Sequence, residues 1–116
     1  MKKDLTVFLK HILESTSRIE NYLQGVNEDS FYASTEKQDM VVRRLEIIGE
    51  ATKNLPNEFR EKYPEVAWKD MAGMRDVIVH QYFDINYKRV WDTAKNFLPP
   101  LKMKIQEILE KEEKKS

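Results

Sequence analysis

Arg75, His80 and Tyr82 place a guanidinium, an imidazole and a phenol within eight residues of the chain. An imidazole titrates near neutral pH, at about 6.5 in its reference state, so His80 could act as a base or an acid. The planar fork of Arg75 could bind two phosphate oxygens, and Tyr82 could accept a covalent modification. These groups suit phosphoryl chemistry, of which the simplest case is attack of an RNA 2′-hydroxyl on its own phosphate. That reaction requires a base, an acid and a cation, but no metal and no cofactor.

The helical pattern around this motif sets its expected geometry. If the motif were one ideal helix, Arg75 and His80 would point about 140° apart, because five residues advance a helix by about 500°. Asp76 and His80 are four residues apart and would share a face, so the carboxylate could orient the imidazole. Arg75 could converge with His80 only if its long side chain reached around the helix or if the helix loosened near His80.

A two-fold homodimer would resolve this geometry. One chain supplies a single suitable histidine, whereas two chains would bring two Arg75 and two His80 side chains to one composite cleft. One histidine could then serve as base and the other as acid. The alternative reading is structural: a His–Tyr pair at a helix end can simply pack and hydrogen-bond a carbonyl, and Arg75 and Asp76 can be surface charges. The other histidine, His11, lies beside an apolar stripe and is interpreted as a surface residue.

Composition restricts the class of protein. The chain has 116 residues, 41% hydrophobic and 34% charged, which suits one globular domain rather than a disordered or membrane protein. Twenty basic and twenty acidic residues cancel, so no broad positive field is available to hold long nucleic acid. The absence of cysteine excludes disulfides and thiolate metal sites and fits a cytoplasmic location. The N-terminus does not resemble a signal peptide, and no segment approaches the length of a membrane span.

Two amphipathic helices are expected in the first half of the chain. The first begins near Asp4 and ends at Gly25. The second begins near Ser34 or Thr35, with Thr35 as the cap and Gln38 completing a capping box. Between them, Phe31 and Tyr32 are expected to tuck against the bundle. The apolar stripes at spacings of three and four comprise Leu5, Phe8, Leu9, Ile12, Thr16, Ile19 and Leu23, then Val41, Leu45, Ile48, Thr52 and Leu55.

The second half is expected to add a short helix over 56–62 and two main helices. One opens at Pro64 with Glu65, carries the motif and ends near residues 80–83. The other begins at Asp84 as its cap and crosses Pro99-Pro100 with a kink, because its apolar phase is preserved. Gly49 is expected to allow close approach of another helix. The sequence therefore predicts an all-α antiparallel bundle of four main helices plus a short one, in a single domain over 1–116, with a frayed tail at 111–116.

The segment Arg75-Asp-Val-Ile-Val-His80-Gln-Tyr82 resembles the Arg-x-x-x-x-His-x-Tyr motif of HEPN-domain toxins of the HepT type. These proteins are the toxin half of HEPN–MNT toxin–antitoxin modules. The resemblance extends to Arg44-Leu-Glu-Ile-Ile-Gly-Glu-Ala51, to Trp68-Lys-Asp-Met-Ala-Gly-Met-Arg75 and to Phe83-Asp-Ile-Asn-Tyr-Lys-Arg-Val-Trp91. It covers nearly the whole chain in the family's order and shows no departure within the motif.

This resemblance implies a homodimeric helical bundle that is a metal-independent endoribonuclease acting on transfer or messenger RNA. Arg75 and His80 would be the catalytic pair, and Asp76 would have a supporting role. Tyr82 would be the tyrosine that a cognate MNT-type nucleotidyltransferase antitoxin modifies with AMP from ATP. The added bulk and negative charge would block RNA at the cleft.

Alternatives remain for the chain and for several of its residues. A catalytically silent HEPN module that binds a nucleotide or a partner, or a plain helical dimerisation protein, would share the same fold. Five cationic residues could line an RNA path but are expected on solvated faces: Arg43, Arg44, Lys53, Lys88 and Arg89. Trp68 and Trp91 could stack bases but are expected in the core, because both lie on apolar stripes.

Overall fold

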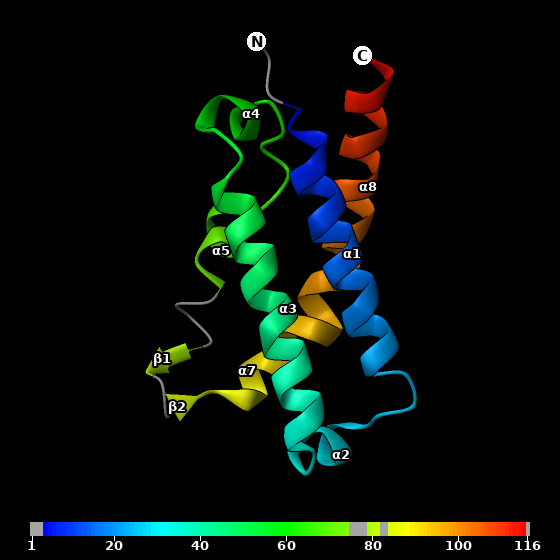
Figure 1. The fold of residues 1–116 in the computed structure, drawn as a ribbon, viewed down its shortest axis with the longest axis vertical. Coiled ribbons are helices and arrows are strands. Elements are labelled where there is room, and N and C mark those ends of the chain that lie inside the picture. Colours follow the sequence, from blue (N-terminus) through cyan, green and yellow to red (C-terminus); the bar gives the residue numbers. More distant parts are fainter. Residues whose placement is uncertain (1–3, 75–78, 82–83, 116) are drawn as a thin grey trace.

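Helices form almost all of the regular structure in the computed structural model, which describes residues 4–74, 79–81 and 84–115 (Figure 1). The helices are α1 (Thr6–Tyr22), α2 (Glu28–Tyr32), α3 (Thr35–Lys53), α4 (Asn57–Glu61), α5 (Trp68–Ala72), α7 (Tyr87–Asp92), the π-helix η1 (Thr93–Phe97) and α8 (Leu98–Lys114). Two short strands, β1 (Val79–Gln81) and β2 (Asp84–Ile85), pair at the edge of the bundle. The prediction of an all-α bundle is confirmed, and this small ribbon is an addition to it.

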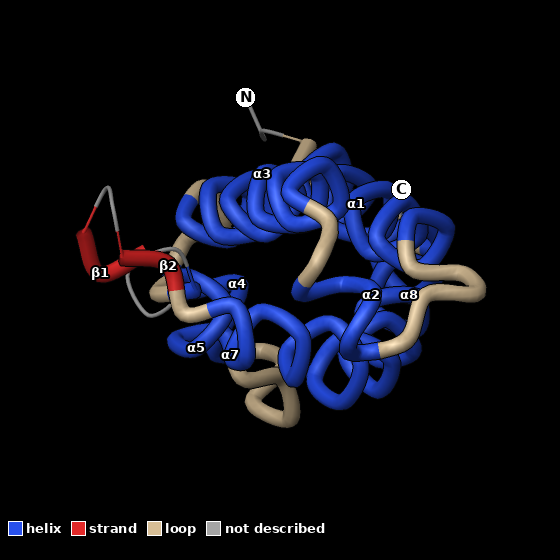
Figure 2. Tube along the Cα trace, turned by 90° about the horizontal axis from the view of Figure 1, so that it is seen from below, coloured by secondary structure: helices blue, strands red, loops and turns tan. Residues whose placement is uncertain are grey.

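The three long helices α1, α3 and α8 form the centre of the bundle, with α1 in contact with both of the others (Figures 1 and 2). The chain measures 47 × 29 × 22 Å along its principal axes. The apolar stripes predicted from helical spacing supply the core, in which Leu9, Ile12, Leu45, Ile48 and Ile105 are at most 1% exposed. Burial of these stripes is the main force that holds the helices together.

The turn that leads into α3 corrects the predicted cap. Ser34, and not Thr35, is the cap, since its hydroxyl accepts a hydrogen bond from the backbone N–H of Lys37 at 3.1 Å. Gln38 does not complete a capping box. It is buried, and its amide donates to the carbonyls of Phe31 and Tyr32 at 3.1 and 3.0 Å. Gln38 therefore ties α3 to α2, which a one-helix capping pattern does not reveal.

The predicted long C-terminal helix is present as α7, η1 and α8 in unbroken succession. Its irregular part is a π-helix, in which the N–H of Leu98 bonds the carbonyl of Thr93 five residues earlier. Pro99 and Pro100 have no N–H, so they cannot bond the carbonyls of Lys95 and Asn96 as an α-helix requires. The missing donors explain why this turn widens at its observed position.

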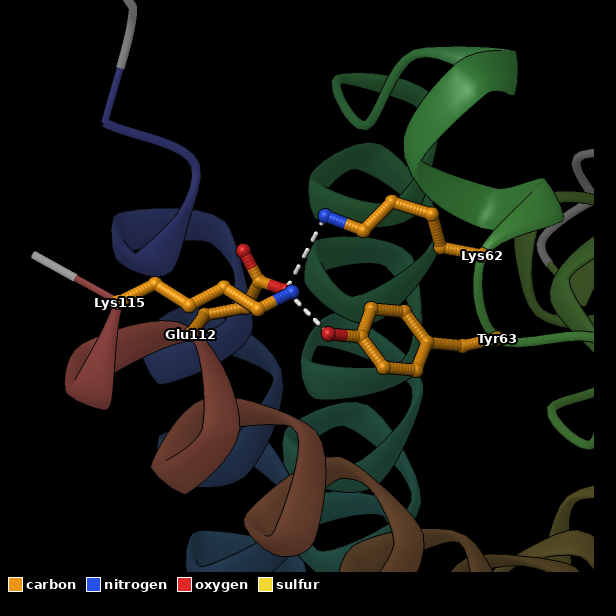
Figure 3. Close-up of polar contacts among 4 residues, drawn as sticks. All are labelled: Lys62, Tyr63, Glu112 and Lys115. Atoms are coloured by element: carbon orange, nitrogen blue, oxygen red, sulfur yellow. Dashed lines mark hydrogen bonds and ion pairs between the residues drawn. The ribbon is translucent and has the colours of Figure 1, made fainter.

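The tail predicted to fray at 111–116 is helical through Lys114, because Glu112 anchors it (Figure 3). The hydroxyl of Tyr63, on the loop after α4, donates to Oε2 of Glu112, and Lys62 and Lys115 lie 3.4 and 3.3 Å from the same oxygen. Partial burial raises the pKa of the Glu112 carboxyl, but the hydrogen bonds from Tyr63, Lys115 and Lys62 together hold it below its usual value. Burial, and then the bond to Glu112, raise the pKa of the Tyr63 phenol.

These shifts define the pH range in which the Tyr63–Glu112 bond stabilises the fold. Its contribution is present above the unfolded pKa of Glu112 and is lost as pH falls through the lowered folded value; on the Tyr63 side it is lost at alkaline pH. We expect Tyr63→Phe to lower the free energy of unfolding by about 1 kcal/mol at neutral pH. Urea denaturation should show this difference shrinking below the ordinary glutamate pKa of about 4.3. Tyr32→Phe removes an exposed phenol–carboxylate bond to Glu28 and is the matched control, with a smaller expected loss.

Within the described residues, no helix is both long enough and apolar enough to cross a membrane.

Candidate functional site

The motif does not form the single helix that its sequence pattern suggested. The helix α5 covers only Trp68–Ala72 and is followed by Gly73, and β1 places the backbone of His80 in a strand antiparallel to β2, with Val79 opposite Ile85. The prediction of a helix from Pro64 to residues 80–83 is therefore wrong. Within the described residues, the β-branched Val79 begins β1 and favours extended backbone, and β1 pairs with β2.

Three of the four predicted site residues, Arg75, Asp76 and Tyr82, lie outside the described residues, and so does their arrangement around His80. The helical angle of about 140° between Arg75 and His80 no longer applies, because His80 is in a strand. The i to i+4 pairing of Asp76 with His80 loses its basis for the same reason. The convergence of Arg75 with His80 stays a prediction, because Arg75 lies outside the described residues.

The helix α5, which precedes the motif, is packed firmly on the rest of the bundle. Met71 is fully buried, and Trp68, which is 6% exposed, donates its indole N–H to the carbonyl of Tyr63 at 2.9 Å. Gly49 of α3 faces the last carbonyls of α5: a Cβ at Gly49 would lie 3.4 Å from the Met71 oxygen and 3.6 Å from the Ala72 oxygen. The expectation that Gly49 permits close approach of another helix is confirmed. That helix is α5, which precedes Arg75 in the chain.

The contact of Gly49 with α5 leads to a prediction about stability. Gly49→Ala should raise the free energy of unfolding by up to about 1 kcal/mol, because alanine favours the helix and its Cβ reaches only ordinary contact distance. Gly49→Leu should lower it by about 1–3 kcal/mol, because the added carbons meet backbone that cannot rotate away. Urea denaturation of both variants measures the difference. Equal stability of the two variants would mean that α5 does not pack tightly on α3.

The chain leaves the motif into α7, which is also fixed. Asn86, and not the predicted Asp84, is the cap: its side-chain oxygen accepts the backbone N–H of Arg89 at 3.0 Å, and Asp84 belongs to β2. Val90 is fully buried, and the ring of Trp91 lies 5.4 Å from that of Phe31. The described residues that precede and follow segment 75–85 are therefore anchored on the helical bundle.

A hollow of about 600 Å³ lies between these two anchors. It is lined by Asp70 and Met74 from the α5 side and by Arg89, Asp92, Thr93, Asn96 and Phe97 from α7 and η1. Sequence reasoning identified Arg89 as a candidate for RNA contact but missed the other six. Pro99-Pro100 was the available signal, since paired prolines within a preserved helical phase indicate an irregular turn upstream.

The remaining side chains singled out in the sequence behave mostly as expected. Trp68 is buried and Trp91 half-buried, so both contribute to packing, and His11 is exposed on α1. Arg44 is half-buried, and Arg18 and Arg44 together lower the pKa of the Tyr22 phenol by hydrogen bonding. Exposed cations are Arg43, Lys53, Lys88 and Arg89, of which Arg43 lies 3.9 Å from Glu46 and Lys88 lies 3.7 Å from Asp92. In the described part of the chain no three His, Asp or Glu side chains cluster in a way that could hold a metal ion.

The fold and the motif define a small all-α bundle with an Arg-x-x-x-x-His segment held between two anchored elements. Residues 12–108 match the family described as "Ribonuclease HepT-like". The chain belongs to this HepT-like ribonuclease family.

Individual relatives agree with that assignment. The chain is 44% identical over 105 residues to a "Putative RNase" of Caldanaerobacter subterraneus, covering 90% of this chain and 94% of the relative. It is 38% identical over 108 residues to a "Probable ribonuclease HepT" of Thermococcus cleftensis, covering 93% and 98%. It is also 47% identical over 114 residues to a "Gamma-glutamylcyclotransferase and putative RNase" of Methanocaldococcus jannaschii; these cover 98% of this chain but only 51% of that relative. No solved structure matches the chain significantly.

Proposed function

We propose that this protein is the ribonuclease toxin of a toxin–antitoxin module and acts as a homodimer on RNA in the cytoplasm. The observation that carries the proposal is membership of the HepT-like ribonuclease family combined with an unaltered Arg75-x-x-x-x-His80-x-Tyr82 motif. The anchoring of both ends of the motif segment supports it, because a catalytic constellation must be held in position by its scaffold.

The reaction follows from the chemistry of the motif. His80 of one protomer removes the proton from an RNA 2′-hydroxyl, and the freed oxygen attacks the adjacent phosphorus. Arg75 binds the non-bridging oxygens and stabilises the charge that develops there. The bond to the 5′-oxygen breaks, and the partner protomer's histidine protonates that leaving group. The products are a 2′,3′-cyclic phosphate and a 5′-hydroxyl, and every step proceeds without a metal ion.

Neutralisation would occur at Tyr82. A cognate MNT-type nucleotidyltransferase would transfer the AMP group of ATP to the phenol oxygen and release pyrophosphate. The attached phosphate would bring negative charge and bulk beside Arg75, where the RNA phosphate must bind, and so block the cleft. Mass spectrometry after co-expression with a nucleotidyltransferase encoded next to this gene would detect the added adenylyl group and locate it on the tyrosine.

The central test is incubation of the purified protein, without its partner, with total cellular RNA in EDTA. The expected result is a set of discrete fragments that end in cyclic phosphate. RNA cut only after a divalent metal is restored would contradict the metal-independent mechanism. Intact RNA under both conditions, together with tight binding of a nucleotidyltransferase, would favour the non-catalytic interaction module instead.

A further inference from the structure

The hollow lined by Asp70 of α5, by Met74 and by residues of α7 and η1, named here the α5–η1 pocket, has the size of a ligand site and is open to solvent. Its volume of about 600 Å³ falls within the range of small-molecule pockets. Apolar contact comes from Met74, which is 5% exposed, and from the half-buried ring of Phe97. Around them lie two carboxylates, a guanidinium, an amide and a hydroxyl, supplied by Asp70, Asp92, Arg89, Asn96 and Thr93.

Most of this polar lining has no partner among the residues that the structure describes. Within the described residues, the side chains of Asp70, Arg89 and Asn96 form no hydrogen bond or ion pair with the protein. Asp92 is the exception, since its carboxylate lies 3.7 Å from the ammonium of Lys88. Polar groups that line a hollow and have no partner in the described part of the chain can donate to or accept from a ligand.

The widened turn contributes to the shape of this pocket. Three of its lining residues, Thr93, Asn96 and Phe97, belong to η1. Single π-turns are rare and recur at functional sites. Here the turn also leaves the Asn96 carbonyl without the α-helical donor that residue 100 would supply, because that residue is proline. The turn therefore brings an amide side chain and a ring to the same hollow.

The charges of the lining select the chemical class of the ligand. Two carboxylates disfavour a phosphate inside the pocket, whereas they accept hydrogen bonds from amino groups. An asparagine amide both donates and accepts, as the edge of a nucleobase does, and an aromatic ring and a thioether provide apolar surface against a base face. Arg89 remains available to hold the negatively charged backbone at the rim. This combination fits a base that carries an exocyclic amino group better than uracil, which has none.

We propose that the α5–η1 pocket binds one unstacked base of the RNA substrate and prefers adenine, cytosine or guanine to uracil. The proposal rests on the function proposed above and adds a base preference to it. Met74 is covalently joined to Arg75, so a base in this pocket belongs to a nucleotide close to the phosphate that Arg75 would bind. The pocket would thus select where the RNA is cut.

The test uses binding, so that it does not depend on cleavage. The probes are 2′-O-methyl hexanucleotides of adenine, cytosine and uracil, which lack the attacking hydroxyl, titrated by fluorescence anisotropy. Wild-type protein is expected to bind the adenine or the cytosine oligonucleotide about tenfold more tightly than the uracil one. Asn96→Ala and Asp70→Asn should each reduce this ratio severalfold while weakening uracil binding little. Gln106→Ala, an exposed amide on α8 outside the pocket, is the matched control and should keep the wild-type ratio.

Each alternative outcome has a distinct meaning. Equal affinity of the wild-type protein for all three oligonucleotides would overturn the base pocket, and so would an unchanged ratio in both pocket variants whose melting temperatures match the wild type. Cleavage of cellular RNA in EDTA alongside either result would leave the ribonuclease function standing. Absence of both cleavage and oligonucleotide binding would instead reject the ribonuclease function, and the base pocket with it.

Discussion

His80→Ala is expected to lower the rate of RNA cleavage by about 10²- to 10⁴-fold without unfolding the protein. General acid–base catalysis typically contributes an effect of this size, and the proposed dimer loses its base and its acid together when both protomers carry the change. The backbone of His80 belongs to β1, which lies at the edge of the helical bundle (Figure 2). The measurement is the initial rate of cleavage of a defined RNA in EDTA, with far-ultraviolet circular dichroism to check the fold.

The chain provides its own control for this experiment. His11 is the only other histidine in the sequence, and it is exposed on α1. His11→Ala should therefore leave the rate unchanged. The wild-type pH–rate profile should be bell-shaped, because one histidine must be neutral and the other protonated. If His80→Ala retained wild-type activity, the acid–base role of His80 would be wrong even if the protein proved to be a ribonuclease.

The long helices were predictable because their stability depends on a repeated pattern. The stripes on α1, α3 and α8 recur every three or four residues over several turns, and their members form the core. Because this pattern extends over several turns, it predicts the helix correctly even when one residue at its end is misassigned. Thus α3 was predicted although Thr35, and not Ser34, was expected to be its cap. The continuity of the C-terminal helix was also predictable, since the apolar phase continues across Pro99-Pro100.

The candidate site was harder to predict because no long pattern governs it. The α5 helix is only five residues long and is held by contacts from elsewhere, including Gly49 of α3 and the carbonyl of Tyr63. The apolar residues Met71, Met74 and Ile78 continue a helical spacing in the sequence, so the sequence predicts a helix through to His80. Pairing with β2 instead makes Val79–Gln81 a strand, and a strand partner cannot be read from helical spacing. The α5–η1 pocket was missed for a related reason, because its walls come from segments about twenty residues apart.

Phe31→Ala is expected to lower the free energy of unfolding by about 3–5 kcal/mol, the largest effect on stability among the changes considered. The ring of Phe31 is fully buried, and its centre lies 5.4 Å from that of Trp91. Phe31 thereby joins the short helix α2 to α7, the helix that leads out of the motif segment. A helix of five residues cannot hold this position by its own hydrogen bonds, so the cavity left by the ring should loosen α2 and α7 together.

The neighbouring tyrosine separates burial from aromatic character. Tyr32 is 39% exposed, and its hydroxyl donates to Glu28 at 2.7 Å. Tyr32→Ala should therefore cost about 1 kcal/mol or less, although it removes a larger side chain. Urea denaturation of both variants gives the comparison. Similar losses of unfolding free energy in the two variants would mean that the core does not depend on Phe31. A large loss confined to Phe31→Ala would mean that the Phe31 ring holds α7, the helix after the motif segment, on the bundle. In that case hydrogen exchange should be faster in α7 of the Phe31→Ala variant than in α7 of Tyr32→Ala, because only the first change removes the partner of Trp91.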